Sequence, residues 1–479
     1  MCRPPQPCCP TKPCGSGTVW PPLTTETSPR QPATRAFRSP RASLLAFHQL
    51  IRTHCSHSHP LLKVSSVNAP LPPALFDQLS ATASSEGVSA MLSALGDELS
   101  RERRWHALFD LRLMQARRAE GLPVAGDAGT LTPAVRDAFE ERSRQACLEV
   151  GWPLLDEGQV AAAWMYLRAS AELDEVAARL EQVAATLDGR DDDDARRLLE
   201  ELVHVALWEA VNPPLGLTLL LAHNGTCNTI TAYDQSVSRL PPVRQAPAAR
   251  VLVDHLTAEL IANLQSDLTR RGTAITGLDT LPGLLAAAGD PSQPLGPHVD
   301  VSHLHSVLRF GRVCSDAETL TKSLELARYA DRLPEELRYP GDGPFTELAK
   351  ASRLFYAGCL GQDTDAAAAF FSEQAGIRET DASPSSRGPL EQLAVEYLIV
   401  LLARGGQPAK AVRVALAHLP RGGEQAATTG LVPPVVELAT AAEATQPGCM
   451  QLLLDTCRER GDAVTFAQAL AVQAGSTAS

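Results

Sequence analysis

Small residues recur at fixed steps in the apolar stretches of this chain, and this spacing constrains its fold more than any other feature. Gly151, Gly158 and Ala163 stand seven and five residues apart, with Leu154 and Leu167 at helical steps among them. A small residue on a helix, followed by another beyond a turn, lets two helices pack closely. The spacing therefore predicts helical hairpins whose two helices lie against each other.

Parts of the same spacing return twice in the second half of the chain. The matching positions are Gly361, Ala366 and Phe370 in one copy, and Gly406, Ala411 and Ala415 in the other. Each copy contains only the turn and the second helix of the pattern. We therefore expect a stack of antiparallel helical hairpins whose units have diverged from one another.

The composition supports an all-α class. Hydrophobic residues make up 44% of the chain and aromatic residues only 5%, so the core must be built mainly from Leu, Ala and Val. Sheets favour aromatic and β-branched residues, whereas Ala and Leu are strong helix formers. No run of alternating polar and apolar residues indicates a strand.

Charge is unevenly distributed along the chain. Residues 1–66 contain eight basic side chains and one acidic side chain, whereas residues 67–479 contain 35 basic and 54 acidic ones. A nucleic-acid-binding domain normally carries a basic surface. The acidic bulk of the chain therefore argues against nucleic acid as its partner.

The distribution of cysteines and the hydropathy of the chain indicate in which cellular compartment the protein is located. Beyond residue 66 six cysteines are scattered without any CxxC pair, as expected for buried thiols in a reducing compartment. No apolar run approaches the roughly 20 residues that a helix needs to span a bilayer. We therefore expect a cytoplasmic location and no membrane partner.

Residues 1–70 do not resemble a folded segment. They are rich in Pro, Ser, Thr, Arg and Cys and lack sustained periodicity, which is typical of a disordered arm. The same Arg-rich, Ser-rich composition is also found in organellar transit peptides. A third interpretation is a misassigned start, with the true start near Val67.

The remaining chain divides at residues 273–298, which are rich in Gly and Pro and are predicted to be a linker. The expected segments are an N-terminal helical domain at 71–272 and a C-terminal one at 299–479. Thr132-Pro133 predicts a helix start, and Ser315-x-x-Glu318 predicts a capping box. Residues His223–Thr231 are predicted to form a polar loop.

The segment Cys147–Ser170 resembles the tetratricopeptide repeat. Gly151 matches the small residue of the family's first helix, Gly158 its turn, Ala163 the small residue of its second helix, and Leu167 its large packing residue. The resemblance departs from the family elsewhere, because Gly361 and Gly406 are 45 residues apart, whereas the repeat has about 34. The chain as a whole resembles bacterial helical-repeat proteins, which supply no biochemical assignment.

The resemblance implies a tetratricopeptide-like α-solenoid in two segments. Solenoids of this kind present a concave surface that holds a peptide or a partner helix. The expected function is a non-catalytic protein-binding scaffold, whose partner the sequence does not identify. No cofactor and no metal ion is expected.

An alternative function is that of an enzyme or small-ligand-binding protein with a polar pocket between the two segments. Its candidate residues are His223, Asn224, Thr226, His303 and His305. The competing interpretation is structural: Asn and Gly commonly build turns, and His305 lies on an apolar helix stripe where a buried histidine is expected. Convergence of the two groups on one pocket would favour the alternative.

Three other clusters have both a functional and a structural interpretation. His54, Cys55, His57 and His59 are metal-ligand types, but no second ligand cluster accompanies them. The run Asp191–Asp194 suggests a metal or pyrophosphate site, yet it lies at a predicted helix start where carboxylates cap the helix.

The third cluster is the only basic concentration outside the arm. It consists of Arg101, Arg103, Arg104, Arg112, Arg117 and Arg118, which flank Trp105 and Phe109. One interpretation of this cluster is a surface that binds an acidic partner or RNA. The other is a helix face exposed to solvent.

Overall fold

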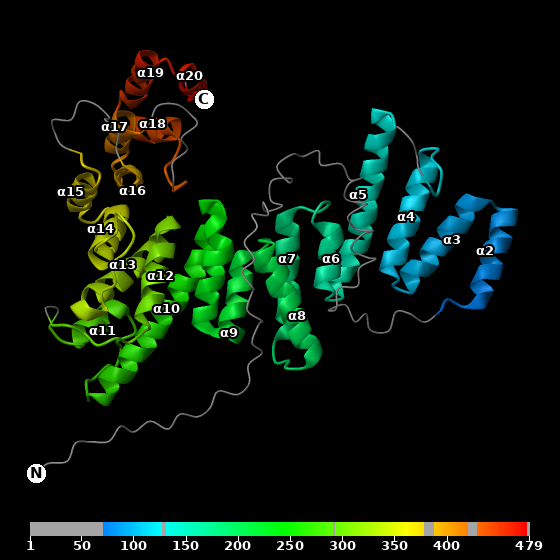
Figure 1. Cartoon of the computed structure of the whole chain (residues 1–479), viewed down its shortest axis with the longest axis horizontal. Helices are drawn as coiled ribbons and strands as arrows, with labels where there is room; N and C mark the ends of the chain where they lie inside the picture. Colours follow the sequence, from blue (N-terminus) through cyan, green and yellow to red (C-terminus); the bar gives the residue numbers. More distant parts are fainter. Residues whose placement is uncertain (1–69, 127–130, 291–292, 378–387, 420–428, 477–479) are drawn as a thin grey trace, which may run out of the picture. The chain divides into compact units, whose positions relative to one another are not determined.

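The structure is a computed structural model that describes residues 70–126, 131–290, 293–377, 388–419 and 429–476. Within these ranges every regular element is a helix and no strand occurs, which confirms the predicted all-α class (Figure 1). Residues 1–69 lie outside the described ranges, and with them the predicted arm and the cluster His54–His59.

Nineteen α-helices carry the described fold, with short 3₁₀ and π segments between some of them. The first eight are α2 (Pro73–Ser85), α3 (Val88–Arg101), α4 (Trp105–Ala119), α5 (Pro133–Asp156), α6 (Val160–Leu167), α7 (Leu173–Ala184), α8 (Asp193–Val203) and α9 (Pro213–Ser236). The next six are α10 (Pro242–Arg270), α11 (Leu281–Ala287), α12 (Val301–Phe310), α13 (Ala317–Asp331), α14 (Leu348–Cys359) and α15 (Thr364–Gln374). The last five are α16 (Pro389–Arg404), α17 (Pro408–His418), α18 (Val435–Glu443), α19 (Cys449–Arg460) and α20 (Ala463–Ser476).

Side-chain caps start several of these helices. The Thr132 hydroxyl accepts a hydrogen bond from the amide of Val135 at 3.5 Å, which confirms the predicted start of α5. Asp192 caps α8 by accepting from the amide of Ala195 at 2.8 Å, so the aspartate run serves this helix terminus. The capping box predicted at Ser315 is wrong by one residue, because Asp316 is the cap of α13.

The polar loop predicted at His223–Thr231 is also wrong, because these residues are helical within α9. The helix is interrupted only at Gly225, whose φ of 77° and ψ of 173° are non-helical. Asn228 and Thr229 then donate side-chain hydrogen bonds to the carbonyls of Asn224 and Gly225, at 2.8 and 2.9 Å. The turn-forming residues therefore bond one helical turn back instead of building a loop.

The spacing that begins at Gly151 lies where α5 and α6 approach closely. A Cβ atom on Gly151 of α5 would lie 2.6 Å from Cδ2 of Leu167 of α6, so only glycine permits this approach. Ala163 and Leu167 are fully buried. Gly158 adopts a φ of 76° in the turn, where the amide of Gln159 donates to the carbonyl of Leu154 at 2.9 Å and closes the end of α5.

The second copy packs with a different register. Ala366 is exposed, whereas Ala367 is fully buried with its Cβ against Gly358 of α14. Phe371, not Phe370, is likewise the fully buried aromatic residue. The turn here contains one more residue than the turn at Gly158, because Asp363 caps α15 with a φ of 50°. In the third copy Ala411 is fully buried.

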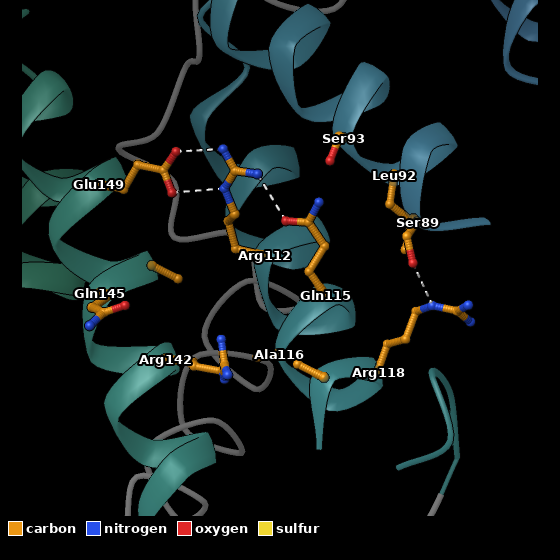
Figure 2. Close-up of a pocket in the computed structure, with 12 residues that line it drawn as sticks. Ser89, Leu92, Ser93, Arg112, Gln115, Ala116, Arg118, Arg142, Gln145 and Glu149 are labelled. Carbon is orange, nitrogen blue, oxygen red and sulfur yellow. Dashed lines mark hydrogen bonds and ion pairs between the residues drawn. The ribbon is translucent and has the colours of Figure 1, made fainter. Parts of the chain in front are cut away.

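Helices α3, α4 and α5 pack in succession. An ion pair between Arg112 of α4 and Glu149 of α5 joins two of them (Figure 2). Leu108 of α4 and Val150 of α5 are fully buried. This packing places one side-chain stripe of each of the three helices around a common pocket.

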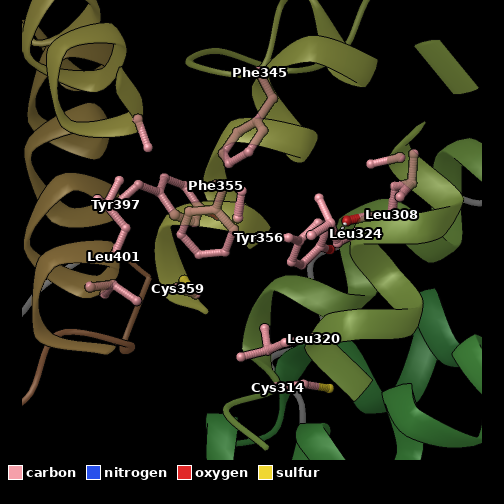
Figure 3. Close-up of a cluster of buried hydrophobic side chains, with 14 of the residues drawn as sticks. Leu308, Cys314, Leu320, Leu324, Phe345, Phe355, Tyr356, Cys359, Tyr397 and Leu401 are labelled. Atoms are coloured by element: carbon pink, nitrogen blue, oxygen red, sulfur yellow. Dashed lines mark hydrogen bonds between the residues drawn. The ribbon is translucent and has the colours of Figure 1, made fainter. Parts of the chain in front are cut away.

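The main buried cluster extends from Leu207 to Ala469. Its aromatic part contains Phe345, Phe355 and Tyr397, with ring centroids 4.8 to 5.8 Å apart (Figure 3). Residues 273–298, predicted to be a linker, contain α11 and contribute Leu281 and Leu284 to the same cluster. This segment is therefore a packed part of the fold, because its leucines recur at helical steps between the glycines and prolines.

Candidate functional site

A pocket of about 470 Å³ lies across helices α3, α4 and α5 (Figure 2). We call it the arginine pocket. Its lining consists of Ser89, Leu92, Ser93, Arg112, Gln115, Ala116, Arg118, Ala119, Arg142, Gln145, Ala146 and Glu149. Three arginines and a single carboxylate therefore form its charged lining, in a chain whose net charge is −12.

Each helix presents one stripe to this pocket. Positions 142, 145, 146 and 149 of α5 follow the i, i+3, i+4, i+7 rule, and so do positions 112, 115, 116 and 119 of α4. Helix α3 adds positions 89, 92 and 93. Leu92, Ala116 and Ala146 are nearly fully buried and form an apolar floor, above which the longer polar side chains rise.

Arg112 is held rigidly by its neighbours. Its Nε donates to Oε2 of Glu149 at 2.8 Å, and one terminal nitrogen donates to Oε1 at 2.7 Å. Its other terminal nitrogen donates to Gln115 at 2.8 Å and lies over Gly96 of α3. The hydrogen bond with Glu149 raises the pKa of Arg112 above its ordinary value. This arginine therefore links α4 to α5 and contacts α3.

Arg118 and Arg142 are held differently, each through its Nε atom alone. Arg118 donates to the hydroxyl of Ser89 at 3.1 Å, and Arg142 donates to Oε1 of Glu120 at 3.1 Å. Within the described residues no protein acceptor engages the terminal nitrogens of either guanidinium. Both side chains are therefore oriented by the fold while their outer donors stay available to an anionic ligand.

The basic cluster predicted from the sequence does not form one surface. Arg101 and Arg103 pair with Glu98 and Glu157, and Arg117 donates to the carbonyl of Pro123. Trp105 also donates to Glu157, and Phe109 is buried. Of this cluster only Arg112 and Arg118 line the pocket. Arg142, which comes from the next helix, was missed because it lies 24 residues further along the chain.

The polar residues predicted to form an alternative pocket engage separate partners. Thr226 is hydrogen-bonded to Nε2 of His255 at 2.9 Å, whereas Nε2 of His305 donates to the carbonyl of Pro340 at 3.3 Å. His223 and Asn224 are exposed, and His303 is half-buried in the first turn of α12. None of these five residues lines the arginine pocket.

A second cavity, of about 500 Å³, also excludes these residues. Its lining includes Pro242, Val243 and Pro247 of α10 together with Arg404 of α16. Arg404 donates to the carbonyls of Arg312 and Cys314, at 3.1 and 2.8 Å, and is therefore committed to the fold. Arg250 also lines this cavity and pairs with Asp254 and Glu318. Of these two cavities, the arginine pocket is the one lined by arginines that are held through Nε alone.

Three of the buried thiols are poor candidates for a covalent nucleophile. Burial raises the pKa of the thiols of Cys147, Cys314 and Cys359 to about 12, which keeps them protonated and poorly nucleophilic. Within the described ranges no group of three or more His, Cys, Asp or Glu side chains is placed to hold a metal ion. No described helix is both long and apolar enough to cross a bilayer.

Comparison of the chain with protein-family models, curated proteins and solved structures yields no match.

Proposed function

We propose that this protein is a non-catalytic interaction scaffold that binds an acidic segment of a protein partner in the arginine pocket. The observation that carries the proposal is the state of Arg118 and Arg142. Both are oriented through Nε, and the described residues supply no acceptor for their terminal nitrogens. Carboxylates match the planar fork of such a guanidinium.

The form of the pocket supports a peptide as the ligand. Its floor of Leu92, Ala116 and Ala146 crosses three helices, so an extended segment can lie over it while acidic side chains meet the arginines. Arg142 keeps 52% of its side-chain surface exposed, as suits a cation that meets the surface of a partner. Small-molecule sites instead bury most of the ligand in a concave cavity.

Several features support the wider proposal of a tetratricopeptide-like solenoid in the cytoplasm. Successive helices from α13 to α20 pack against their sequence neighbours, and further contacts join α14 with α16 and α17 with α19. That pattern is typical of stacked hairpins. The protonated buried thiols suit a reducing compartment.

Nucleic acid is a poorer candidate for the same pocket. Phosphate backbones are bound by extended rows of Lys and Arg, whereas Arg101, Arg103 and Arg117 are each engaged by a protein acceptor. The net charge of −12 adds repulsion at long range.

Fluorescence anisotropy with a labelled oligoglutamate peptide tests the proposal on the full chain. We expect binding that weakens about tenfold in the double variant Arg118→Gln/Arg142→Gln, because two charge-assisted contacts are lost. Arg136→Gln is the matched control, since Arg136 is exposed on α5 and does not line the pocket. Equal binding by the double variant, or equal binding of an oligoglutamine peptide of the same length, would overturn the proposal.

A further inference from the structure

Arg312 is a buried arginine whose side chain has no hydrogen-bond partner. It lies in the 3₁₀ segment Gly311–Val313 that follows α12, and only 5% of its surface is exposed. Within the described residues no atom accepts a hydrogen bond from its guanidinium, and no carboxylate forms an ion pair with it. A buried charge is costly unless it is paired. Arg312 therefore lacks the partner that a buried cation normally has.

Two other arginines in the same half of the chain show what Arg312 lacks. Arg309 donates to both carboxylate oxygens of Asp234, each at 2.9 Å. Arg332 donates through a terminal nitrogen to the carbonyl of Leu285 at 2.7 Å. Each of these guanidinium groups has an oxygen acceptor within the fold, so the missing acceptor distinguishes Arg312 from them.

Two aromatic rings hold the guanidinium of Arg312 in place. Its Cζ atom lies 3.5 Å from the ring centroid of Phe345 and 6.0 Å from that of Tyr397. Both rings belong to the aromatic part of the main buried cluster (Figure 3). Aromatic rings attract a cation, but they supply no oxygen for its N–H donors. The rings therefore orient the group and leave it able to bind an anion.

The charged groups around Arg312 favour an anion there. Burial lowers the pKa of His305 on α12, and the nearby charges of Arg312 and Arg309 lower this pKa further. The carboxylate of Asp342 opposes them with a smaller effect, and this residue is exposed. Because Arg309 is already paired, Arg312 is the cation of this group that is left to bind a ligand.

We propose that the guanidinium of Arg312 binds a small oxyanion, either a carboxylate or a phosphate ion. Its Nε is fully covered by protein, so the ligand meets the two terminal nitrogens. Their N–H donors form a planar fork that matches two oxygens of such an ion. A small ion fits better than a segment of a macromolecule, because so little of the side chain is exposed. Arg312 does not line the arginine pocket, so this site is independent of it.

Thermal unfolding of the full chain in sodium phosphate, sodium acetate or sodium chloride at equal ionic strength tests this inference. An ion that binds the folded state raises the unfolding midpoint as its concentration increases. We expect a saturable rise in phosphate, in acetate or in both, relative to chloride, and the two salts distinguish the two oxyanions. Arg312→Met keeps an apolar side chain against Phe345 but removes the donors, so it should abolish the rise.

Three further variants separate this site from other cationic sites. Arg332→Met is the matched control, because the terminal nitrogens of Arg332 already donate to backbone carbonyls, and it should retain the rise. Arg118→Gln/Arg142→Gln should retain the rise as well. Arg312→Lys keeps the charge but loses the planar fork, so we expect at least fivefold weaker binding.

The Arg312→Lys variant also decides the case in which Arg312→Met does not fold. Unchanged affinity in either Arg312 variant would overturn the inference. The absence of any rise in the wild type would do the same, and so would a rise that the Arg118/Arg142 double variant abolishes.

Discussion

Arg112 of α4 binds Glu149 of α5 through two hydrogen bonds of 2.8 and 2.7 Å, while its guanidinium lies over Gly96 of α3. This side chain thereby bonds to one neighbouring helix and contacts the other. The arginines of the pocket are therefore of two kinds. Each nitrogen of the Arg112 guanidinium donates a hydrogen bond within the fold, whereas the terminal nitrogens of Arg118 and Arg142 meet no acceptor among the described residues. The predictions about the pocket follow from this division.

Removing the charge of Glu149 should strengthen the binding of an acidic ligand. Glu149→Gln deletes the only carboxylate that lines the pocket, so we expect the oligoglutamate peptide to bind about threefold more tightly. The variant should lose only about 0.5 kcal/mol of stability, because the ion pair is partly exposed. Anisotropy and urea unfolding measure the two effects. Glu141→Gln is the control, since Glu141 pairs with Arg144 on α5 outside the pocket, and an equal gain in that variant would contradict the assignment.

The close approach of α5 and α6 predicts a strong coupling between two residues. Gly151→Ala places a methyl group 2.6 Å from Cδ2 of Leu167 and should cost about 2 kcal/mol through overpacking. Leu167→Ala leaves a cavity and should cost about 3 kcal/mol. The double variant should be less destabilised than the sum of the two costs, because the added methyl group enters the vacated space. Strictly additive free energies of unfolding would show that the two residues do not compete for the same volume.

How far the sequence predicts this packing depends on the turn. Only one residue, the cap Gln159, lies between Gly158 and the first residue of α6, so counting five residues forward from Gly158 finds the buried Ala163. At Gly361 the turn holds one more residue, and the same count finds the exposed Ala366. Local spacing indicates that two helices meet. It does not fix the register, because that depends on whether a non-glycine residue adopts a left-handed conformation in the turn.

The corrected register of α15 can be tested with two neighbouring alanines. Ala367→Leu should destabilise the protein by about 2 kcal/mol, because the Cβ atom of Ala367 already lies against Gly358 and the site cannot hold a larger side chain. Ala366→Leu should change the free energy of unfolding by less than about 0.5 kcal/mol, because the position is exposed. Urea denaturation compares the two, and the reverse order would restore the register first predicted from the sequence.

Stability should fall when the pH is lowered from about 7.5 to 5.5. Burial lowers the pKa of His305 below its ordinary value of 6.5, so the unfolded chain binds more protons than the folded one in this interval. Burial lowers the pKa of His106 in the same direction. The stabilising effect of a neutral His305 is therefore present above the unfolded pKa and is lost as the pH decreases below it. His305→Gln should reduce the pH dependence of the urea midpoint, and an unchanged dependence would show that this histidine does not contribute.

The arginine pocket was only partly predictable from the sequence. Arg112 and Arg118 belonged to a visible basic cluster, but a count of charges could not show that Arg101 and Arg103 are neutralised by Glu98 and Glu157. Arg142 shows no basic clustering of its own. Arg142 belongs to an i, i+3, i+4, i+7 stripe on α5, which the sequence does contain. That stripe identifies a pocket only when the helices packed beside it are known.

Charge exchange at Arg118 and Arg142, whose terminal nitrogens meet no acceptor among the described residues, tests whether these side chains bind the acidic segment. The variant Arg118→Glu/Arg142→Glu is titrated by anisotropy with labelled oligoglutamate and oligolysine peptides at two salt concentrations. If the pocket binds an acidic segment through these side chains, the variant loses the oligoglutamate peptide and gains the oligolysine peptide, and salt weakens both interactions. Wild-type affinity of the variant for oligoglutamate would show that Arg118 and Arg142 do not bind the acidic segment.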